Sequence, residues 1–503
     1  MQRRHVLTLA AAASFATPAF VRHVRAAGQP RFALGVASGQ PQAGSVVLWT
    51  RLTGPELPPR ADVTWELAED EACTRIAARG VEPALAQDAH SVHAEPAGLQ
   101  PARWYWYRFN ALGQRSAVGR TRTAPAADAV VDKFEFATAS CQRYDVGHYA
   151  AWQHCAAEDL DLVLFLGDYI YEYASSAQAL RAYFSGPGVL LDDYRNRYAQ
   201  YKSDPALQAA HAACPWLVIW DDHEVENDYA GLQGQRLQPN FAAQRAAAYQ
   251  AWWEHLPLPK AARPVDGATR VYGSLDWGRL ARLHLLDDRQ YRDVQVCPRS
   301  GRGGSNVAKL ANCAPFNDPQ RTLLGAAQER WLAGNWSLER PWNLLAQQTL
   351  MARFSWQDPA RGAEYWTDGW DGYAPARNRL LGVVAERKVP GVVVLGGDVH
   401  ANYVADLKAD FDDPRSPVVA AEFCGTSISS LGLPQDRVDA ARRFNPHVHL
   451  ARADQRGYGR FTLRQRGLEA RLAVVADARD PASALGTQAR FVVQAGKAGA
   501  DPA

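Results

Sequence analysis

The chain of 503 residues has almost no excess of either charge and no long apolar run in its body. Lys and Arg number 55 against 53 Asp and Glu, a formal net charge of +2. Four arginines lie in residues 1–27, which contain no acid, so the remainder carries 51 bases (55 less four) against 53 acids. This balance lacks the basic excess of general nucleic-acid binders. Beyond residue 27, no run of about 20 apolar residues predicts a transmembrane span.

The sequence also lacks a P-loop and a motif that would activate a serine. The Gly-rich stretch GRGGSN (301–306) does not end in the Gly-Lys-Ser/Thr of a phosphate-cradling loop. A serine phosphatase needs a base beside one particular serine, and no pattern indicates such a pair. With 47% apolar and 21% charged residues, the composition is that of an ordinary globular protein with room for more than one domain.

Cysteines are few, and their odd number, seven, cannot pair fully within one chain. Cys297 and Cys313 bracket a loop rich in Gly, Ser and Asn, and they are the first candidates for a disulfide. Cys155 with Cys214 is a second candidate pair. At least one cysteine must therefore have another role.

The N-terminal residues 1–27 have the layout of an export signal. The pair Arg3-Arg4 precedes an apolar stretch (6–21), and Ala26-Ala27 offers a small-residue cleavage site. The adjacent arginines favour the twin-arginine route. We therefore predict recognition by the twin-arginine export machinery and a periplasmic or secreted protein. A disordered tail is the alternative.

A change of pattern along the chain predicts two folded domains. Short β-branched and aromatic segments such as GSVVLWTRL and RWYWYRFNAL fill residues 28–125 and predict a small β-sandwich of immunoglobulin or fibronectin type. After a linker, residues 130–485 combine buried strands with helices, as in an α/β fold. Within them, RFTLRQRGLEARLAVV predicts a closing hairpin. Residues 486–503 predict a C-terminal tail with a last strand and a flexible end.

Five apolar runs of the second domain end in residues that could bind a ligand. They are FEFATAS, LVLFLGD, WLVIWDD, RLHLLDD and GVVVLGGD. Because sites in open α/β sheets form outside the carboxyl ends of the strands, we expect these ends to meet at one edge. They deliver a thiol, carboxylates, a phenol and a histidine. Carboxylates suit hard cations, whereas a thiolate, a phenolate and an imidazole together suit a transition ion such as iron.

The ordered motifs resemble the PhoD family of alkaline phosphatases and phosphodiesterases, within the calcineurin-like metallophosphoesterases. The matching stretches are FALGVASGQPQAGSVVLWTRL, FATASCQ, LFLGDYIYEY, WDDHEVENDY, LDDRQYRD, GGDVHANY and EFCGTSISS. The resemblance implies an α/β fold in which a small β-sandwich precedes an αββα metallophosphoesterase sandwich. It also implies a site with ferric iron (Fe³⁺) and calcium (Ca²⁺). One departure is Leu431, which stands where the family commonly has a second glycine.

Carried over position by position, the resemblance implies seven metal ligands: Cys141, Asp168, Tyr171, Asp222, Asn227, Asp398 and His400. The thiolate, the phenolate and the imidazole would bind iron, and Asp168 would bridge iron and calcium. Asp222 and Asp398 replace neutral ligands of the wider superfamily by anionic oxygens, which favours calcium. Asn227 would be a calcium ligand or lie just outside the ligand shell.

The same resemblance implies catalytic roles for Asp168, His223 and Arg289. Metal-activated water would attack phosphorus in line, and Arg289 would hold the phosphate oxygens with its planar fork. His223 would assist the leaving group as a general acid. Taken singly, these residues have structural interpretations, such as a salt bridge for Arg289.

The sequence thus predicts an exported, metal-dependent phosphoesterase that hydrolyses small-molecule phosphate esters, monoesters first and diesters as well. Two alternatives stay open. One is a phosphodiesterase of the phospholipase D type, which the same family includes. The other is a non-catalytic periplasmic protein that binds metal or phosphate.

Overall fold

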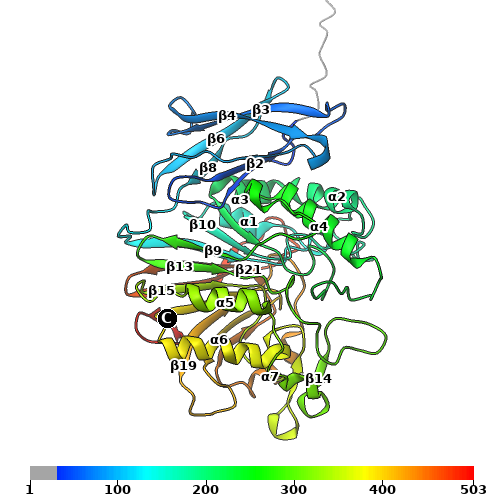
Figure 1. Cartoon of the computed structure of the whole chain (residues 1–503), viewed down its shortest axis with the longest axis vertical. Coiled ribbons are helices and arrows are strands. Elements are labelled where there is room, and N and C mark those ends of the chain that lie inside the picture. Colours follow the sequence, from blue (N-terminus) through cyan, green and yellow to red (C-terminus); the bar gives the residue numbers. More distant parts are fainter. Residues whose placement is uncertain (1–30) are drawn as a thin grey trace, which may run out of the picture.

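The computed structural model describes residues 31–503, and the predicted signal peptide (1–27) lies outside them. An N-terminal β-sandwich stacks on a larger region in which two sheets lie between layers of helices (Figure 1). None of the helices in this described part of the chain is both long enough and apolar enough to span a membrane.

The largest sheet has ten strands and contains three of the five predicted runs as neighbours. β9, β10 and β11 are parallel to one another, and β21 pairs antiparallel with β9. In sheet order the strands are β24 (Asp501–Pro502), β23 (Leu485–Gln494), β22 (Gly467–Val475), β21 (Arg456–Arg464), β9 (Lys133–Ala139), β10 (Leu162–Leu166), β11 (Trp216–Ile219), β1 (Val36–Gly39), β2 (Val47–Arg51) and β5 (Ser91–Ala94).

The second sheet has seven strands and contains the other two runs, as β13 and β17. In sheet order its strands are β12 (Gly273–Trp277), β13 (Ala281–Leu285), β15 (Trp342–Ala346), β17 (Val392–Gly396), β19 (Val418–Cys424), β18 (Asn402–Lys408) and β20 (Val448–Arg452). The prediction that all five runs end at the edge of one sheet is therefore wrong. Their ends converge from two facing sheets, because β13, β15, β17 and β19 are also parallel.

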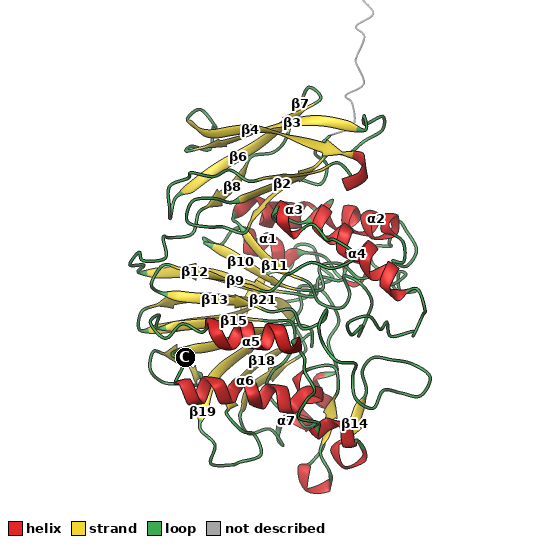
Figure 2. Ribbon diagram, viewed as in Figure 1, coloured by secondary structure: helices red, strands yellow, loops and turns green. Residues whose placement is uncertain are grey.

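Helices cover the outer face of each sheet, which confirms the predicted αββα layering (Figure 2). The first sheet packs against α1 (Ala150–Ala156), α2 (Leu191–Lys202), α3 (Pro205–Ala213) and α4 (Phe241–His255). The second packs against α5 (Gly325–Asn335), α6 (Ala374–Arg387) and α7 (Gln435–Arg442).

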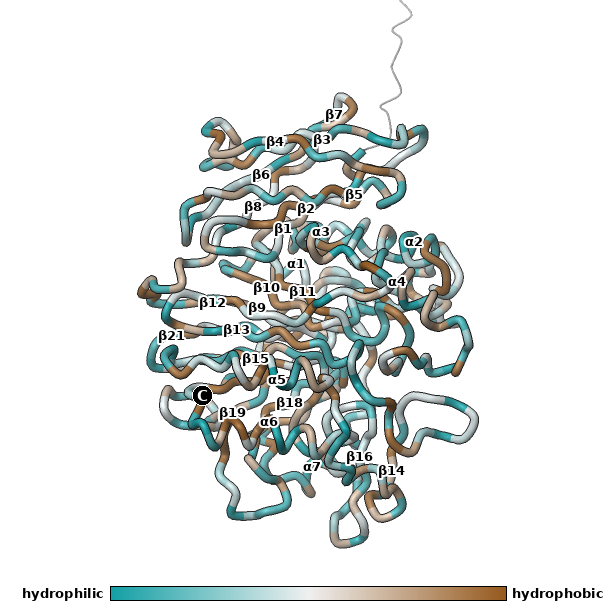
Figure 3. The backbone as a smooth tube through the Cα atoms, in the orientation of Figure 1, coloured by the Kyte–Doolittle hydropathy of each residue, from teal (hydrophilic) through white to brown (hydrophobic). Residues whose placement is uncertain are grey.

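The strand pattern explains these layers. In β10, Val163 and Phe165 belong to the core under the helices, whereas Leu162, Leu164 and Leu166 belong to the core between the sheets. Alternate side chains of a strand point to opposite faces, so a strand that is buried on both faces is apolar throughout. Figure 3 shows these apolar stretches along the central strands.

The N-terminal β-sandwich is confirmed, and one of its layers belongs to the ten-stranded sheet. The other layer is a sheet of β4 (Ile76–Leu85), β3 (Arg60–Ala68), β6 (Trp104–Ala111), β7 (Gln114–Arg115) and β8 (Gly119–Arg122). β1 lies parallel to β11 through Gly39 and Trp216. A Cβ at Gly39 would lie 2.6 Å from the Trp216 carbonyl oxygen, so this close strand approach requires glycine. The predicted boundary at residue 125 stays a prediction.

The C-terminal residues pair with the sheet, and the predicted flexible end is wrong. β21 and β22 form the expected hairpin. After β23 the chain turns back, and Asp501 and Pro502 pair with Val492 and Phe491. The backbone N–H of Ala500 also donates to the Asp406 carboxylate at 3.1 Å. These backbone bonds fix the end of the chain against its neighbours.

The predicted disulfide between Cys297 and Cys313 is present. The alternative pair is not bonded, because Cys155 and Cys214 are free, buried thiols. The loop closed by the disulfide contains β14 (Val307–Lys309), which pairs with β16 (Glu364–Trp366) in a small separate sheet.

Candidate metal centre

The carboxyl ends of the parallel strands of both sheets bring the predicted ligands together. Four groups of side chains each offer ligand atoms within 4.8 Å of one another: Cys141, Asp168 and His400; Asp168, Asp222 and His223; Asp221, Asp222 and Asp398; and Asp222, Asp228 and Asp368. Asp168 and Asp222 each belong to more than one group, so the groups form one continuous cluster.

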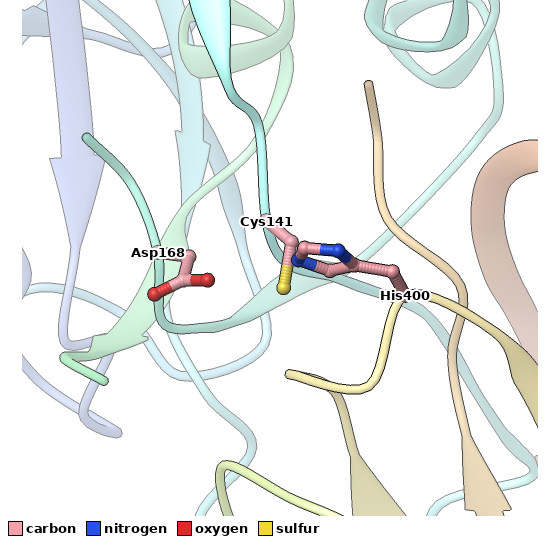
Figure 4. Close-up of side chains that lie close together, drawn as sticks. All are labelled: Cys141, Asp168 and His400. Carbon is pink, nitrogen blue, oxygen red and sulfur yellow. The ribbon is translucent and has the colours of Figure 1, made fainter. Parts of the chain in front are cut away.

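One end of the cluster combines a thiol, a phenol and an imidazole. Cys141 follows β9, Asp168 follows β10 and His400 follows β17, and the Cys141 sulfur lies between the other two side chains (Figure 4). The Tyr171 hydroxyl lies 2.8 Å from Asp168 Oδ2 and 3.1 Å from His400 Nε2. These four side chains are the predicted iron ligands, and the structure places them side by side.

The protonation chemistry of this end fits a cation. His400 Nδ1 lies 2.7 Å from the Leu431 carbonyl oxygen, to which it donates, so Nε2 keeps its lone pair for a metal. Burial lowers the pKa of His400 to about 3, which keeps the imidazole neutral. Burial also raises the pKa of the Cys141 thiol and of the Tyr171 phenol. Both therefore need a neighbouring cation to ionise.

The other end of the cluster is acidic and has unpartnered oxygens. Asp221 Oδ2, Asp222 Oδ1 and Asp398 Oδ2 are buried and have no hydrogen-bond partner. Burial, and then the neighbouring Asp221, raise the pKa of Asp398 well above its usual value. Buried carboxylate oxygens without partners are costly, and a hard cation would satisfy them. The donor set therefore fits a metal at this end too.

Backbone strain is concentrated at the same residues. Cys141, Asp168, Asp398 and His400 have φ values of 57°, 59°, 65° and 53°, in the left-handed region that L-residues rarely adopt. Each such residue costs on the order of 1 kcal/mol or more, and such strain clusters at functional sites. The strand ends are thus held where their side chains converge.

Two residues that the sequence analysis did not single out hold the ends of β10 and β11 together. Gly167 has φ = 100°, and a Cβ there would lie 2.6 Å from the Asp221 nitrogen. The buried Glu224 carboxylate accepts the backbone N–H groups of Asp168 at 3.0 Å and Asp221 at 2.8 Å. Glu224 stands within the motif WDDHEVENDY, next to the predicted His223, which was the available signal.

His223 lies in the cluster, next to the carboxylate of Glu172. Its Nδ1 lies 2.7 Å from Glu172 Oε2, and its ring stacks on Tyr171 with centroids 4.1 Å apart. Burial lowers the pKa of His223, but the carboxylates of Glu172, Asp222 and Asp168 outweigh burial and raise it well above its usual value. The imidazole can therefore hold a proton, as a general acid must.

Arg289 reaches the cluster, but carboxylates occupy its fork. Its Nε pairs with Asp221, and its Nη1 lies 2.5 Å from Asp368 Oδ2. Its Nη2 lies 3.6 Å from Asp398 Oδ2 and makes no hydrogen bond. The guanidinium is 1% exposed. The open fork expected for phosphate is therefore not what the structure has, because the buried acids need this positive charge.

A cavity of about 310 Å³ lies over the cluster and presents other cations. Its lining includes the predicted Asn227, whose Oδ1 accepts the Tyr173 hydroxyl at 2.7 Å. Arg299 and Arg302, from the disulfide-closed loop, also line it. Among the described residues, the Arg299 guanidinium has no hydrogen bond or ion pair. The sequence analysis missed both arginines, because no local pattern connects their loop to the strand ends.

Two facing sheets between helices, with a thiol, phenol, imidazole and carboxylate cluster where their strands end, define the metallophosphoesterase class of fold. The family model of the PhoD-like phosphatases matches residues 136–472, and that of their N-terminal domain matches residues 16–125. The chain belongs to the PhoD-like phosphatase family.

Two known relatives are similar to this protein over almost the whole chain. Alkaline phosphatase D of Bacillus subtilis (strain 168) is 43% identical over 486 residues, which cover 93% of this chain and 82% of the relative. A solved structure of PhoD matches with a TM-score of 0.88 and 42% identity, over 94% of this chain and 92% of that one. These similarities confirm the predicted family and the predicted phosphoesterase class.

Proposed function

We propose that this chain is an exported, metal-dependent phosphoesterase that prefers phosphate monoesters. The observation that carries the proposal is the position of Asp168, whose carboxylate belongs both to the group with Cys141 and His400 and to the group with Asp222. A carboxylate has two oxygens and can bridge two metal ions, and two-metal sites bind phosphoryl groups.

We assign Fe³⁺ to the end with Cys141, Tyr171 and His400, and Ca²⁺ to the end with Asp222 and Asp398. Thiolate, phenolate and imidazole are ligands of a transition ion, whereas carboxylate oxygens suit calcium. Asn227, in the wall of the cavity, is the candidate neutral oxygen ligand on the calcium side. When bound, such ions polarise a phosphoryl oxygen and lower the pKa of water.

The side chains of the protein supply the remaining steps. Arg299 and Arg302 face the cavity and are placed to neutralise the oxygens of a phosphate group. His223, held through Nδ1 by Glu172, keeps a proton for the departing alkoxide. Arg289 does not contact the phosphate in this proposal. It is buried beneath the acidic ligands, where it balances the charge of Asp221 and Asp368 and so positions those ligands.

Export is proposed from the sequence alone. The layout of residues 1–27, with its arginine pair, favours the twin-arginine machinery and a periplasmic or secreted location. That route exports folded proteins, which suits a protein whose metal ligands come from strands far apart in the chain.

The test is the hydrolysis of p-nitrophenyl phosphate and bis(p-nitrophenyl) phosphate side by side, with the exported protein supplied with calcium. A higher kcat/KM for the monoester is expected. A higher kcat/KM for the diester would replace the proposal with the phosphodiesterase alternative. No turnover of either would favour the binding protein. Asp168→Asn should abolish turnover without loss of the fold, and retained activity would contradict the bridging role.

A further inference from the structure

A second cavity, of about 400 Å³, opens directly beside the cavity over the metal centre. The two share five lining residues: Arg299, Ser305, Trp366, Asp398 and His400. A phosphate group bound over the metal ligands would therefore have this second space next to it. Nothing in the phosphoesterase chemistry described above uses this space.

The second cavity is lined mainly by apolar and aromatic side chains. Leu350, Phe354, Trp370 and Tyr403 are buried in its lining, and Trp356 and Trp366 are half-buried there. The carboxylate of Asp371, which also lines it, is paired with Arg377 at 2.6 Å. A polyol or sugar group placed here would lose hydrogen bonds to water without replacing them, whereas an apolar group would gain.

Contacts between side chains hold the walls of this cavity in place, and its rim carries exposed apolar side chains. The Trp356 ring meets Phe354 edge-on at 5.0 Å, and the Arg437 guanidinium lies 5.0 Å above the Trp356 centroid. At the rim, Leu431 is 67% exposed and Leu433 is 40% exposed. These two side chains extend the apolar surface of the cavity to its rim, where a bound apolar group would cover them.

We propose that this aromatic cavity binds the organic substituent of the phosphate ester, and that the preferred substrates carry a flat or apolar substituent. The proposal rests on the proposed phosphoesterase function and names the substrate class of the same site. The phosphate lies over the metal ligands beside Arg299, and the substituent lies against Trp356 and Trp366.

The test compares benzyl phosphate with ethyl phosphate by release of inorganic phosphate from the metal-loaded enzyme. Both substrates lose a primary alkoxide, so they differ mainly in the group that the cavity would hold. We expect kcat/KM to be about tenfold or more higher for benzyl phosphate. Trp356→Ala should remove most of that advantage by raising KM for benzyl phosphate much more than KM for ethyl phosphate.

Two further variants keep the test decisive. Leu433→Glu places a charge on the exposed rim and should reduce the benzyl advantage even if Trp356→Ala does not fold. Trp331→Ala removes a half-buried tryptophan that packs on Tyr272, outside the lining of this cavity, and should leave the ratio unchanged. Equal kcat/KM for the two substrates, unaffected by these variants, would overturn the inference while leaving the phosphoesterase intact. Turnover of neither substrate would count against the proposed function itself.

Discussion

The Glu224 carboxylate accepts a hydrogen bond from the backbone N–H of Asp168 at 3.0 Å, across 55 intervening positions of the chain. The same carboxylate accepts from Tyr169 at 2.6 Å and from Asp221 at 2.8 Å. One buried acid therefore fixes the loops that follow β10 and β11. Because these loops carry the proposed bridging carboxylate and the proposed acidic ligands, we infer that Glu224 is a positioning residue for the proposed metal centre.

Glu224→Gln should lower both metal content and stability. The amide keeps the shape but directs an NH₂ group at backbone donors, leaving a buried N–H unsatisfied at a cost of about 1–3 kcal/mol. We expect loss of bound metal in elemental analysis and a lower free energy of unfolding in urea.

The second sheet offers a matched control for this variant. The buried Glu422 carboxylate accepts the backbone N–H groups of Met351 at 2.6 Å and Ala352 at 2.7 Å, but it belongs to none of the ligand groups. Glu422→Gln should cost a similar free energy of unfolding and keep the metal. Equal metal loss in both variants would mean that general destabilisation, rather than positioning by Glu224, explains the effect.

The two arginines near the centre should behave differently. Arg289→Gln leaves the buried Asp221 carboxylate without its cation and Asp368 with Arg292 alone, which should destabilise the fold by about 3–5 kcal/mol. Arg299→Ala removes an exposed, unpaired guanidinium and should change stability by less than about 0.5 kcal/mol. It should instead raise KM for phosphate esters by about tenfold or more, because a charged hydrogen bond to phosphate is lost.

Thermal melting and steady-state kinetics of both variants check this division. Arg415→Ala is the control for removal of an exposed arginine, since its side chain is 93% exposed and lies outside the cavity lining. An unchanged KM in Arg299→Ala, together with a folded Arg289→Gln that has lost substrate binding, would return the phosphate-binding role to Arg289.

The free energy of unfolding should fall in acid, partly because His93 in β5 is buried in its neutral form. Burial lowers the pKa of His93 to about 4, from 6.5 in the unfolded chain, and its ring stacks on Trp253. Because the folded pKa is depressed, this contribution is complete above pH 6.5 and is lost as the pH falls toward 4. At pH 5 the loss is about 2 kcal/mol.

Urea unfolding of the protein and of His93→Gln at pH 8 and pH 5 measures this contribution. The decrease in the free energy of unfolding between the two pH values should be smaller in the variant by that amount. An identical pH dependence in the two proteins would show that His93 is not held neutral by burial.

Local patterns predicted the elements that carry the site, but not how the elements assemble. The run LVLFLGD is apolar on both faces and ends in a turn with Gly167, so a buried strand with a ligand at its end could be predicted. That β13 and β17 lie in a second sheet could not, because the choice of sheet depends on pairings between distant strands. The pairing of β1 with β11 was missed for the same reason.

The candidate ligands were predictable and their supporting groups were not. Cys141, Asp168 and His400 stand in compact motifs at strand ends. The state of Arg289 depends on Asp368, 79 positions away, which no local pattern indicates. Arg299 lies in a loop that meets the site through Ser305, whose backbone N–H and hydroxyl donate to the Asp228 carboxylate, so its exposure over the cavity emerges from tertiary structure.

The most direct test of the account is the metal content and visible spectrum of the exported protein, compared with Tyr171→Phe. If Tyr171 binds ferric iron, the unaltered protein should contain about one iron ion per chain and absorb visible light through the tyrosinate–iron pair. Tyr171→Phe should stay folded and lose that band. A colourless, iron-free protein that still hydrolyses phosphate esters, or an unchanged band in Tyr171→Phe, would contradict the proposed metal centre.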